Sequence, residues 1–306
     1  MKKQPDLSVD IGGIILKNPV MTASGTFGYG IEFGDVVDLS SLGGIIVKGL
    51  SLEPSKGNPP PRIIETACGM LNAIGLENVG IRAFIEKKLP LLKPYKTPVF
   101  INIYGKTERE YAEIAKIAND CEDIAGMEVN ISCPNVSAGG LAFGVDPFSA
   151  ASVVTAVKKN TDKPIMVKLT PNVTDVTVIA KSVESAGADS ISLINTITGM
   201  AIDVKTRKPR IANVVGGLSG PAIKPVALRM VYQVANAVKI PVIGIGGIMN
   251  TEDALEFIIA GASAIQAGTA NFVNPGVTGD IATGIRTYLV ENNIDSINDL
   301  RGTLIV

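Results

Sequence analysis

Eight short apolar runs, separated by amphipathic segments, dominate the hydrophobic pattern of the chain. The runs are nearly continuous in Ile and Val, which is typical of parallel strands buried on both faces. They lie at Val20–Ser24, Ile45–Gly49, Val99–Ile103, Met127–Ser132, Ile165–Leu169, Ser190–Asn195, Val242–Gly246 and Ala264–Gly268. Segments with helical spacing lie between them, at Glu108–Asp120, Pro147–Asn160, Asp175–Ala186, Pro225–Val238 and Thr251–Ala260.

This alternation predicts an α/β fold, a (β/α)₈ TIM barrel, in which residues 1–306 form one domain. The length exceeds the ~250 residues that such a barrel usually needs. A doubly wound open sheet is the alternative architecture. Before the first strand, the stretch LSVDIGGIILK predicts a β-hairpin that turns at Gly12 and Gly13 and covers the bottom of the barrel.

Two connections are long for a barrel. Residues Leu50–Ile81 contain the stiff stretch NPPPRI, and Thr196–Gly220 contain the basic cluster KTRKPR. Both follow the carboxyl ends of strands, so we expect both to lie over the face where barrel active sites are built. The basic cluster is interpreted as a solvated loop tip.

Composition narrows the function classes. Hydrophobic residues make up 46% of the chain, which is enough for a large core. The 28 lysines and arginines nearly balance 29 aspartates and glutamates, which argues against a nucleic-acid scaffold or a polybasic membrane binder. No apolar stretch reaches the roughly 18 residues that span a bilayer, and no signal-peptide pattern opens the chain. We therefore expect a cytoplasmic protein.

The chain contains no histidine, which excludes Ser-His-Asp and Cys-His catalysis and histidine-ligated zinc. A general base must then be a cysteine, lysine, carboxylate, tyrosine or serine. The three cysteines, Cys68, Cys121 and Cys133, are far apart and odd in number, so they do not suggest a disulfide framework. They also cannot supply the four thiolates of a typical iron–sulfur cluster.

Polar residues gather at the carboxyl ends of the predicted strands. They are Ser24, Lys48, Asn102, Asn130, Ser132, Lys168, Asn195 and Thr196, and Gly49 follows Lys48 at the end of its strand. Two lysines without a carboxylate favour an anionic ligand and give little support to a Mg²⁺ or Ca²⁺ site. Asparagine amides suit a flat ring with alternating donors and acceptors.

Glycine-rich turns follow the last two strands, in GIGGI (Gly244–Ile248) and AGT (Ala267–Thr269). In barrels this placement is typical of a phosphate site, because backbone N–H groups can approach the phosphate closely. Structural glycines in tight turns are the alternative interpretation, and snorkelling surface residues are the alternative for the two lysines.

One cysteine stands apart in the stretch VNISCPNVSAGG (Val129–Gly140). Cys133 follows a predicted strand, and Pro134 disfavours helical geometry at the cysteine. A thiol in that place could act as a base or a nucleophile, although a loop cysteine taken alone is more often inert. Cys68 and Cys121 lack this context and are interpreted as structural.

Several motifs together resemble the dihydroorotate dehydrogenase family across nearly the whole chain. They are NPVMTASGTFGYG (Asn18–Gly30), GMLNAIGLEN (Gly69–Asn78), NISCPNV (Asn130–Val136), GGLAFGVDP (Gly139–Pro147), SLINT (Ser192–Thr196) and GASAIQAGTANF (Gly261–Phe272). The resemblance implies an FMN-dependent barrel, with one FMN per chain, that oxidises (S)-dihydroorotate to orotate in pyrimidine biosynthesis. Cys68 departs from the serine expected before GMLNAIGL, outside the catalytic positions.

The resemblance also implies a role for each site residue. Cys133 becomes the base that removes the C5 proton while hydride passes from C6 to FMN. The expected FMN contacts are Ser24, Lys48, Gly49, Asn102, Asn130, Lys168, Ile194, Gly220, Gly246, Gly247, Gly268 and Thr269. The expected substrate contacts are Lys48, Asn72, Ala73, Ile74, Gly75, Leu76, Asn130, Asn195 and Thr196. No metal is expected.

The GGLAFGVDP motif resembles class 1B of the family, a catalytic subunit that works with a second subunit carrying FAD and a [2Fe–2S] cluster. NAD⁺ would then be the final acceptor, in a heterotetramer built around a homodimer. A class 1A homodimer that reduces fumarate is the alternative. A non-redox phosphate-binding lyase or isomerase is a further alternative, which leaves the asparagines and the cysteine unexplained.

Overall fold

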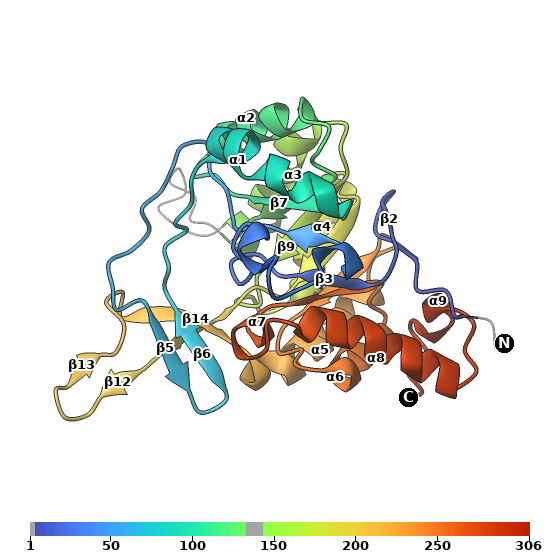
Figure 1. Cartoon of the computed structure of the whole chain (residues 1–306). Coiled ribbons are helices and arrows are strands. Elements are labelled where there is room, and N and C mark those ends of the chain that lie inside the picture. The colour runs from blue at the N-terminus through green and yellow to red at the C-terminus, as the bar shows by residue number, and fades with distance from the viewer. Residues whose placement is uncertain (1–3, 133–142) are drawn as a thin grey trace.

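The computed structural model describes residues 4–132 and 143–306. Its main sheet has eight strands, joined by parallel pairing in the order β3-β16-β15-β10-β9-β8-β7-β4 (Figure 1). They are β3 (Val20–Thr22), β4 (Ile45–Ile46), β7 (Val99–Ile103), β8 (Gly126–Asn130), β9 (Ile165–Leu169), β10 (Ser190–Leu193), β15 (Val242–Ile245) and β16 (Ala264–Ala267).

The sheet closes on itself between its two end strands, β3 and β4. Met21 and Gly44 form a parallel bridge, and the Thr22 N–H donates to the Gly44 carbonyl at 3.3 Å. The Thr22 hydroxyl also accepts the Ile46 N–H at 3.0 Å. The predicted (β/α)₈ barrel is therefore confirmed, and the alternative of an open sheet is wrong.

Helices surround the barrel, and several begin at a side chain that caps the first turn. They are α1 (Ile81–Lys87), α2 (Glu108–Asn119), α3 (Pro147–Lys158), α4 (Val176–Ser185), α5 (Lys224–Ala235), α6 (Thr251–Ile259), α7 (Ala270–Val273), α8 (Val277–Glu291) and α9 (Ile297–Leu300). Thr107, Asp146 and Asp175 accept a first-turn N–H of α2, α3 and α4, which satisfies a donor that the helix leaves open. None of the described helices is long and apolar enough to cross a membrane.

Short 3₁₀ helices complete the connections, at η1 (Ile31–Phe33), η2 (Leu39–Ser41), η3 (Leu89–Tyr95), η5 (Phe143–Val145) and η6 (Pro221–Ile223). The one nearest the carboxyl end of β8 packs against α2. Phe143 meets Tyr111 edge-on, with ring centroids 5.7 Å apart. The fully buried Tyr111 donates its hydroxyl proton to the Asn130 carbonyl at 2.6 Å, which anchors the end of β8.

The two long connections form a second sheet rather than loose loops. Strands β5 (Ile63–Thr66) and β6 (Gly69–Asn72) come from the first connection, and β11 (Ile197–Met200) and β14 (Val215–Ser219) from the second. They pair antiparallel in the order β11-β14-β6-β5, and this sheet projects from the barrel at the lower left of Figure 1. The sequence predicted the placement of these segments but not their strands.

A further hairpin, β12 (Ile202–Asp203) and β13 (Lys208–Pro209), extends beyond this sheet (Figure 1). It carries the basic cluster of Lys205–Arg210, all of whose residues are exposed. The cluster is therefore a solvated loop tip, as predicted.

The amino-terminal hairpin covers the opposite end of the barrel. Strand β1 (Val9–Asp10) pairs antiparallel with β2 (Ile15–Leu16), and both Gly12 and Gly13 have a φ of +94°. The Asp10 carboxylate accepts their N–H groups at 2.9 and 2.7 Å. A Cβ on Gly12 would lie 2.4 Å from the Asp189 carbonyl oxygen, which precedes β10. The hairpin thus packs closely on the bottom of the barrel, as predicted.

Candidate active site

A cavity of about 630 Å³ lies between the carboxyl ends of the barrel strands and the four-stranded sheet. This volume is within the usual range for small-molecule and cofactor sites. Each residue expected to contact FMN lines it, namely Ser24, Lys48, Gly49, Asn102, Asn130, Lys168, Ile194, Gly220, Gly246, Gly247, Gly268 and Thr269. Each expected substrate contact also lines it, namely Lys48, Asn72, Ala73, Ile74, Gly75, Leu76, Asn130, Asn195 and Thr196.

The predicted catalytic base, Cys133, lies outside the described residues. Ser132, which precedes it in the sequence, lines the cavity. The Ser132 hydroxyl oxygen is buried and has no hydrogen-bond partner within residues 4–132 and 143–306. A polar atom left in this state at a cavity wall is suited to a bound polar ligand.

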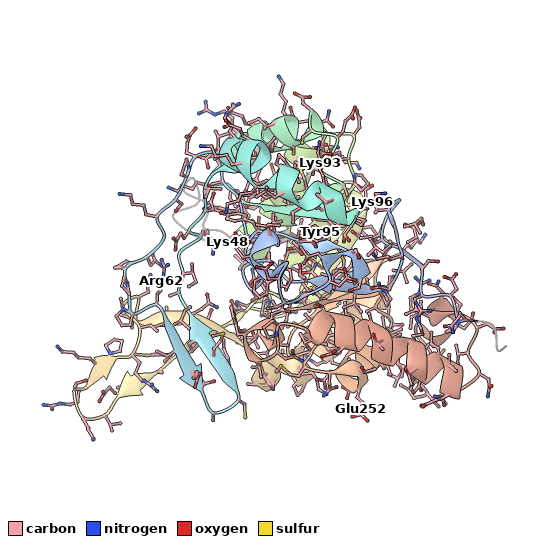
Figure 2. All side chains as sticks on the ribbon, in the orientation of Figure 1. Lys48, Arg62, Lys93, Tyr95, Lys96 and Glu252 are labelled. Atoms are coloured by element: carbon pink, nitrogen blue, oxygen red, sulfur yellow. The ribbon has the colours of Figure 1, made fainter. Side chains whose placement is uncertain are left out.

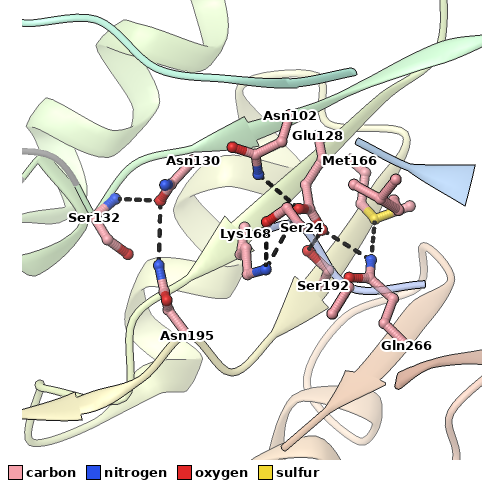
Figure 3. A network of polar contacts seen from close by, with 12 residues as sticks. Ser24, Asn102, Glu128, Asn130, Ser132, Met166, Lys168, Ser192, Asn195 and Gln266 are labelled. Atoms are coloured by element: carbon pink, nitrogen blue, oxygen red, sulfur yellow. Dashed lines mark hydrogen bonds and ion pairs between the residues drawn. The ribbon is translucent and has the colours of Figure 1, made fainter. Parts of the chain in front are cut away.

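Behind the cavity wall lies a buried ion pair between Lys168 on β9 and Glu128 on β8 (Figure 3). Lys168 Nζ lies 3.4 Å from Glu128 Oε1 and donates to Ser24 Oγ at 3.2 Å. The lysine side chain is 6% exposed and the glutamate side chain 0%. Water therefore screens this pair little, and the lysine presents its charge to the cavity.

Three neutral donors complete the surroundings of the Glu128 carboxylate. Oε1 accepts from Asn102 Nδ2 at 2.6 Å, and Oε2 accepts from Ser192 Oγ at 2.9 Å and Gln266 Nε2 at 2.8 Å. Burial alone would raise the pKa of Glu128. The Lys168 ammonium and the three hydrogen bonds outweigh burial and hold this pKa below its ordinary value. Glu128 is therefore ionised at neutral pH.

Reading only the strand ends missed one carboxylate, because Glu128 lies in the middle of β8 and not at its end. Glu128 belongs to β8 and sits one side chain behind the cavity, where it balances the charge of Lys168. The signal that was missed is a glutamate in the apolar stretch GMEVN, since a buried strand holds a charge only with a partner. Of the two lysines in the cavity wall, Lys48 is therefore the one whose positive charge is not balanced by an ion-pair partner among the described residues.

Lys48 lines the cavity, and Figure 2 shows it on the side of the molecule from which the β5–β6 hairpin projects. Burial lowers the pKa of Lys48, Glu77 offsets part of that effect, and Arg62 adds to it. Arg62 and Glu77 form an ion pair with each other. Lys48 has no ion-pair or side-chain hydrogen-bond partner in the described part of the chain, so its ammonium is available to an anion.

Asparagine amides line the wall beside the lysines. Asn130 Oδ1 accepts from Asn195 Nδ2 at 3.3 Å and from the Ser132 N–H at 3.1 Å (Figure 3). On the facing sheet, Asn72 Nδ2 reaches the Gly217 carbonyl at 3.4 Å. The two walls together offer amide donors and acceptors to a flat polar ring.

The glycine turn after β15 has a backbone that only glycine adopts easily. The φ values are +128° at Gly246 and +73° at Gly247. Asp253 fixes the turn, because its Oδ2 accepts the Met249 N–H at 2.8 Å while its Oδ1 accepts from Lys224 Nζ at 2.6 Å. Both glycines line the cavity, and a turn without side chains lets backbone N–H groups approach a phosphate closely.

These residues fit FMN. A cavity of suitable volume has a glycine cradle at one end, a buried cation in its wall and amide donors beside it. No cluster of histidine, cysteine, aspartate or glutamate that could hold a metal ion occurs among the residues described.

The other two cysteines have free thiols and differ in their surroundings. Cys121 packs against the hydrophobic core, in agreement with a structural role. Cys68 is exposed in the turn between β5 and β6, so its thiol has no packing role there. The interpretation of Cys68 as a structural thiol is therefore not supported.

Comparison with known proteins identifies relatives over the full chain. The family model described as dihydroorotate dehydrogenase matches residues 6–289. A protein of Geobacter sp. (strain M21) named dihydroorotate dehydrogenase B (NAD(+)), catalytic subunit, is 62% identical over 302 residues, covering 99% of each chain. Proteins of the same name from Citrifermentans bemidjiense and Geobacter sulfurreducens are 62% and 60% identical, again over 99% of each chain.

Proposed function

Since this chain belongs to the dihydroorotate dehydrogenase family of oxidoreductases, we propose that it oxidises (S)-dihydroorotate to orotate in pyrimidine biosynthesis. One observation carries the proposal: the residues expected to contact FMN and substrate line one cavity at the carboxyl face of the barrel. A non-redox lyase or isomerase would account for the glycine turns but not for the paired amides of Asn130 and Asn195. All 306 residues form one FMN-binding domain in this proposal.

FMN is held by its two ends in this proposal. The Gly246–Gly247 turn and Thr269 take the phosphate, and Lys168 stands at the pyrimidine end of the flavin. When bound, FMN supplies the acceptor for the hydride that leaves C6 of the substrate. Lys168 contributes a positive charge where the flavin gains negative charge on reduction.

The substrate is an anion with a flat imide edge, and the cavity offers matching groups. Lys48 brings the unbalanced positive charge for the carboxylate. Asn72, Asn130 and Asn195 supply amides for the imide edge and fix the ring orientation. Cys133, the proposed base, removes the C5 proton; this assignment rests on the sequence alone.

Anaerobic mixing of the purified chain with dihydroorotate tests the proposal. Bound flavin makes the protein yellow, and the substrate is expected to bleach it with formation of orotate. A preparation that holds no flavin after reconstitution with FMN would contradict the cofactor assignment. A flavoprotein that dihydroorotate fails to bleach would contradict the substrate assignment.

A second subunit belongs to the same proposal. The relatives are named as NAD⁺-linked catalytic subunits, which supports a partner for this chain as well. We infer a partner that carries FAD and a [2Fe–2S] cluster and relays electrons to NAD⁺, in a heterotetramer around a homodimer of this chain. A cytoplasmic location stays a prediction from the sequence.

The isolated chain is expected to reduce artificial dyes with dihydroorotate and to reduce NAD⁺ hardly at all. The three cysteines of the chain are too few for a cluster of its own, so the route to NAD⁺ must come from the partner. Steady-state assays with a dye, NAD⁺ and fumarate as alternative acceptors measure this. Efficient NAD⁺ reduction by the lone chain would contradict the prediction, and fumarate reduction would instead favour the class 1A alternative.

Two glycine substitutions are expected to distinguish the effect of backbone strain on stability from the effect of lost cavity space on FMN binding. Gly246→Ala should destabilise the fold by about 1–3 kcal/mol, because its φ of +128° strains an alanine. The new Cβ would also lie 2.7 Å from the Ala227 Cβ. At Gly268 a Cβ would meet nothing closer than the Ala23 Cβ at 3.4 Å, so Gly268→Ala should keep its stability.

Thermal unfolding of the FMN-free variants measures the contrast, and titration with FMN measures affinity. Gly268→Ala is expected to bind FMN more weakly at unchanged stability, since its methyl group is added at the cavity wall. Equal unfolding temperatures for Gly246→Ala and wild type would show that the turn is not strained by a side chain.

A further inference from the structure

Glu128 is a fully buried carboxylate to which the proposed reaction assigns no part. Its Oε1 lies 3.4 Å from the Lys168 ammonium (Figure 3), and Lys168 lines the cavity whereas Glu128 does not. Hydrogen bonds from Asn102, Ser192 and Gln266 satisfy the rest of the carboxylate. A charge in this position acts on a ligand only through the lysine and through its own field.

We propose that Glu128 is a positioning residue, which compensates the charge of the buried Lys168 ammonium and directs it toward the pyrimidine end of the flavin. The inference rests on the proposed function, in that FMN occupies the cavity. It assigns a role to a residue that touches neither cofactor nor substrate.

Burial makes Lys168 dependent on its partner. The residue is 5% exposed, and a buried charge is costly unless it is paired with an opposite charge. Its other contact is the neutral Ser24 hydroxyl at 3.2 Å. Among the residues described, Glu128 is the one carboxylate within ion-pair distance of Lys168.

The barrel fixes the geometry of the pair. Lys168 and Glu128 stand on neighbouring parallel strands, with Val129 opposite Val167 in register. The three neutral donors come from three other strands, β7, β10 and β16. Because closure of the barrel brings these strands together, the carboxylate is held in place from several sides.

Few other titratable groups face Lys168. The strands that pair with β9 are β8 and β10, and β10 contributes the neutral Ser192. From across the barrel come Ser24, which follows β3, and Gln266 of β16, and both are also neutral. In the described part of the cavity wall, Lys48 and Glu77 are the other charged groups, and neither is within ion-pair or hydrogen-bond distance of Lys168. A titration that involves Lys168 is therefore separable from theirs by substitution.

The expected consequence concerns the reduction potential of bound FMN. Reduction adds negative charge to the flavin, which Lys168 favours and the Glu128 charge opposes. Without Glu128, the protein should bind reduced FMN more tightly relative to oxidised FMN. We expect this ratio of affinities to rise roughly ten- to hundredfold at pH 6, where Lys168 stays charged. At higher pH the lysine without its counter-ion loses its proton. The reduction potential of FMN should then fall more steeply with pH, and we call this change of slope, which wild type lacks, the break.

Glu128→Gln tests this with an isosteric change. The new amide can keep its oxygen toward Asn102 and Lys168 and turn its NH₂ toward Ser192 and Gln266. The Ser192 hydroxyl can then accept, and Gln266 Oε1, which has no partner among the described residues, can accept after the amide turns. The potential of the FMN-loaded full chain is measured from pH 6 to 10 by reductive titration against reference dyes.

Two further variants test whether the break in the pH profile comes from Lys168. In Glu128→Gln/Lys168→Met the break should disappear, because no lysine remains to titrate. Asp123→Asn removes a carboxylate outside the cavity wall, where its side chain is 38% exposed in a surface ion pair, and should leave the pH profile parallel to wild type. If Glu128→Gln does not fold, Glu128→Asp provides a second test, because it keeps the charge at a longer distance from Lys168. Its break should lie at a higher pH than the break expected for Glu128→Gln.

A Glu128→Gln profile parallel to wild type would overturn the inference, and so would a break that persists in the double variant. Both results would leave the proposed function intact, since the protein would still bind FMN and oxidise dihydroorotate. Loss of FMN binding in wild type itself would instead contradict the proposed function.

Discussion

Cys133→Ala is expected to slow flavin reduction by dihydroorotate roughly 10²–10⁴-fold, which is the usual contribution of a positioned base. The chain has no histidine to take over the proton. Of the two lysines in the described cavity wall, Lys168 is one half of an ion pair and Lys48 is assigned to the substrate carboxylate. Binding of FMN and orotate should remain close to wild type, because both depend on other residues. Anaerobic stopped-flow bleaching of the flavin measures the rate.

Serine at the same position provides the matched variant. Cys133→Ser should be slow at neutral pH and recover partly at high pH, because a hydroxyl is a weaker base than a thiol with a reference pKa of ~8.5. Cys121→Ala changes a cysteine that packs against the core and should bleach at the wild-type rate. Rapid bleaching by Cys133→Ala would mean that another group takes the proton.

Lys168→Met is expected to cost roughly 3–5 kcal/mol of unfolding free energy at pH 7, because it leaves Glu128 buried without its counter-ion. Methionine keeps most of the side-chain volume, so lost packing contributes little. FMN bound to the variant should also be harder to reduce. Chemical denaturation of the FMN-free protein and a reductive titration of the loaded protein measure the two effects.

The pH dependence of this loss has a definite sign. In wild type the pKa of Glu128 is held below its ordinary value, so its contribution to stability is present above that value and is lost as pH falls through the lowered pKa. In Lys168→Met burial is no longer opposed by the ammonium, and the pKa should rise. The variant then regains stability on acidification relative to wild type, and the difference in unfolding free energy shrinks toward pH 4.

A surface pair provides the control for this measurement. Lys88→Met removes the partner of Glu32 in an ion pair whose side chains are 34% and 41% exposed. Solvent screening limits such a pair to about 1 kcal/mol or less. A loss in Lys168→Met no larger than that in Lys88→Met would contradict the role of the buried pair.

The sequence by itself determined the strands of the barrel and most of the residues that line the cavity. The runs Val99–Ile103 and Ile165–Leu169 are β7 and β9 at the predicted bounds, because Ile and Val runs bounded by proline or polar residues are local signals. The ends of parallel strands meet at one edge of a barrel, so reading strand ends brought Lys48, Lys168 and the glycine turns into one site.

Only the tertiary structure decided which of these groups neutralise one another. Glu128 and Lys168 are 40 residues apart, and Gln266 is 138 residues from Glu128, so no local pattern pairs them. The same holds for the sheet over the cavity, where Gly217 of β14 pairs with Asn72 of β6. Periodicity records burial along one segment, whereas charge pairing depends on distances that exist only after the barrel has closed.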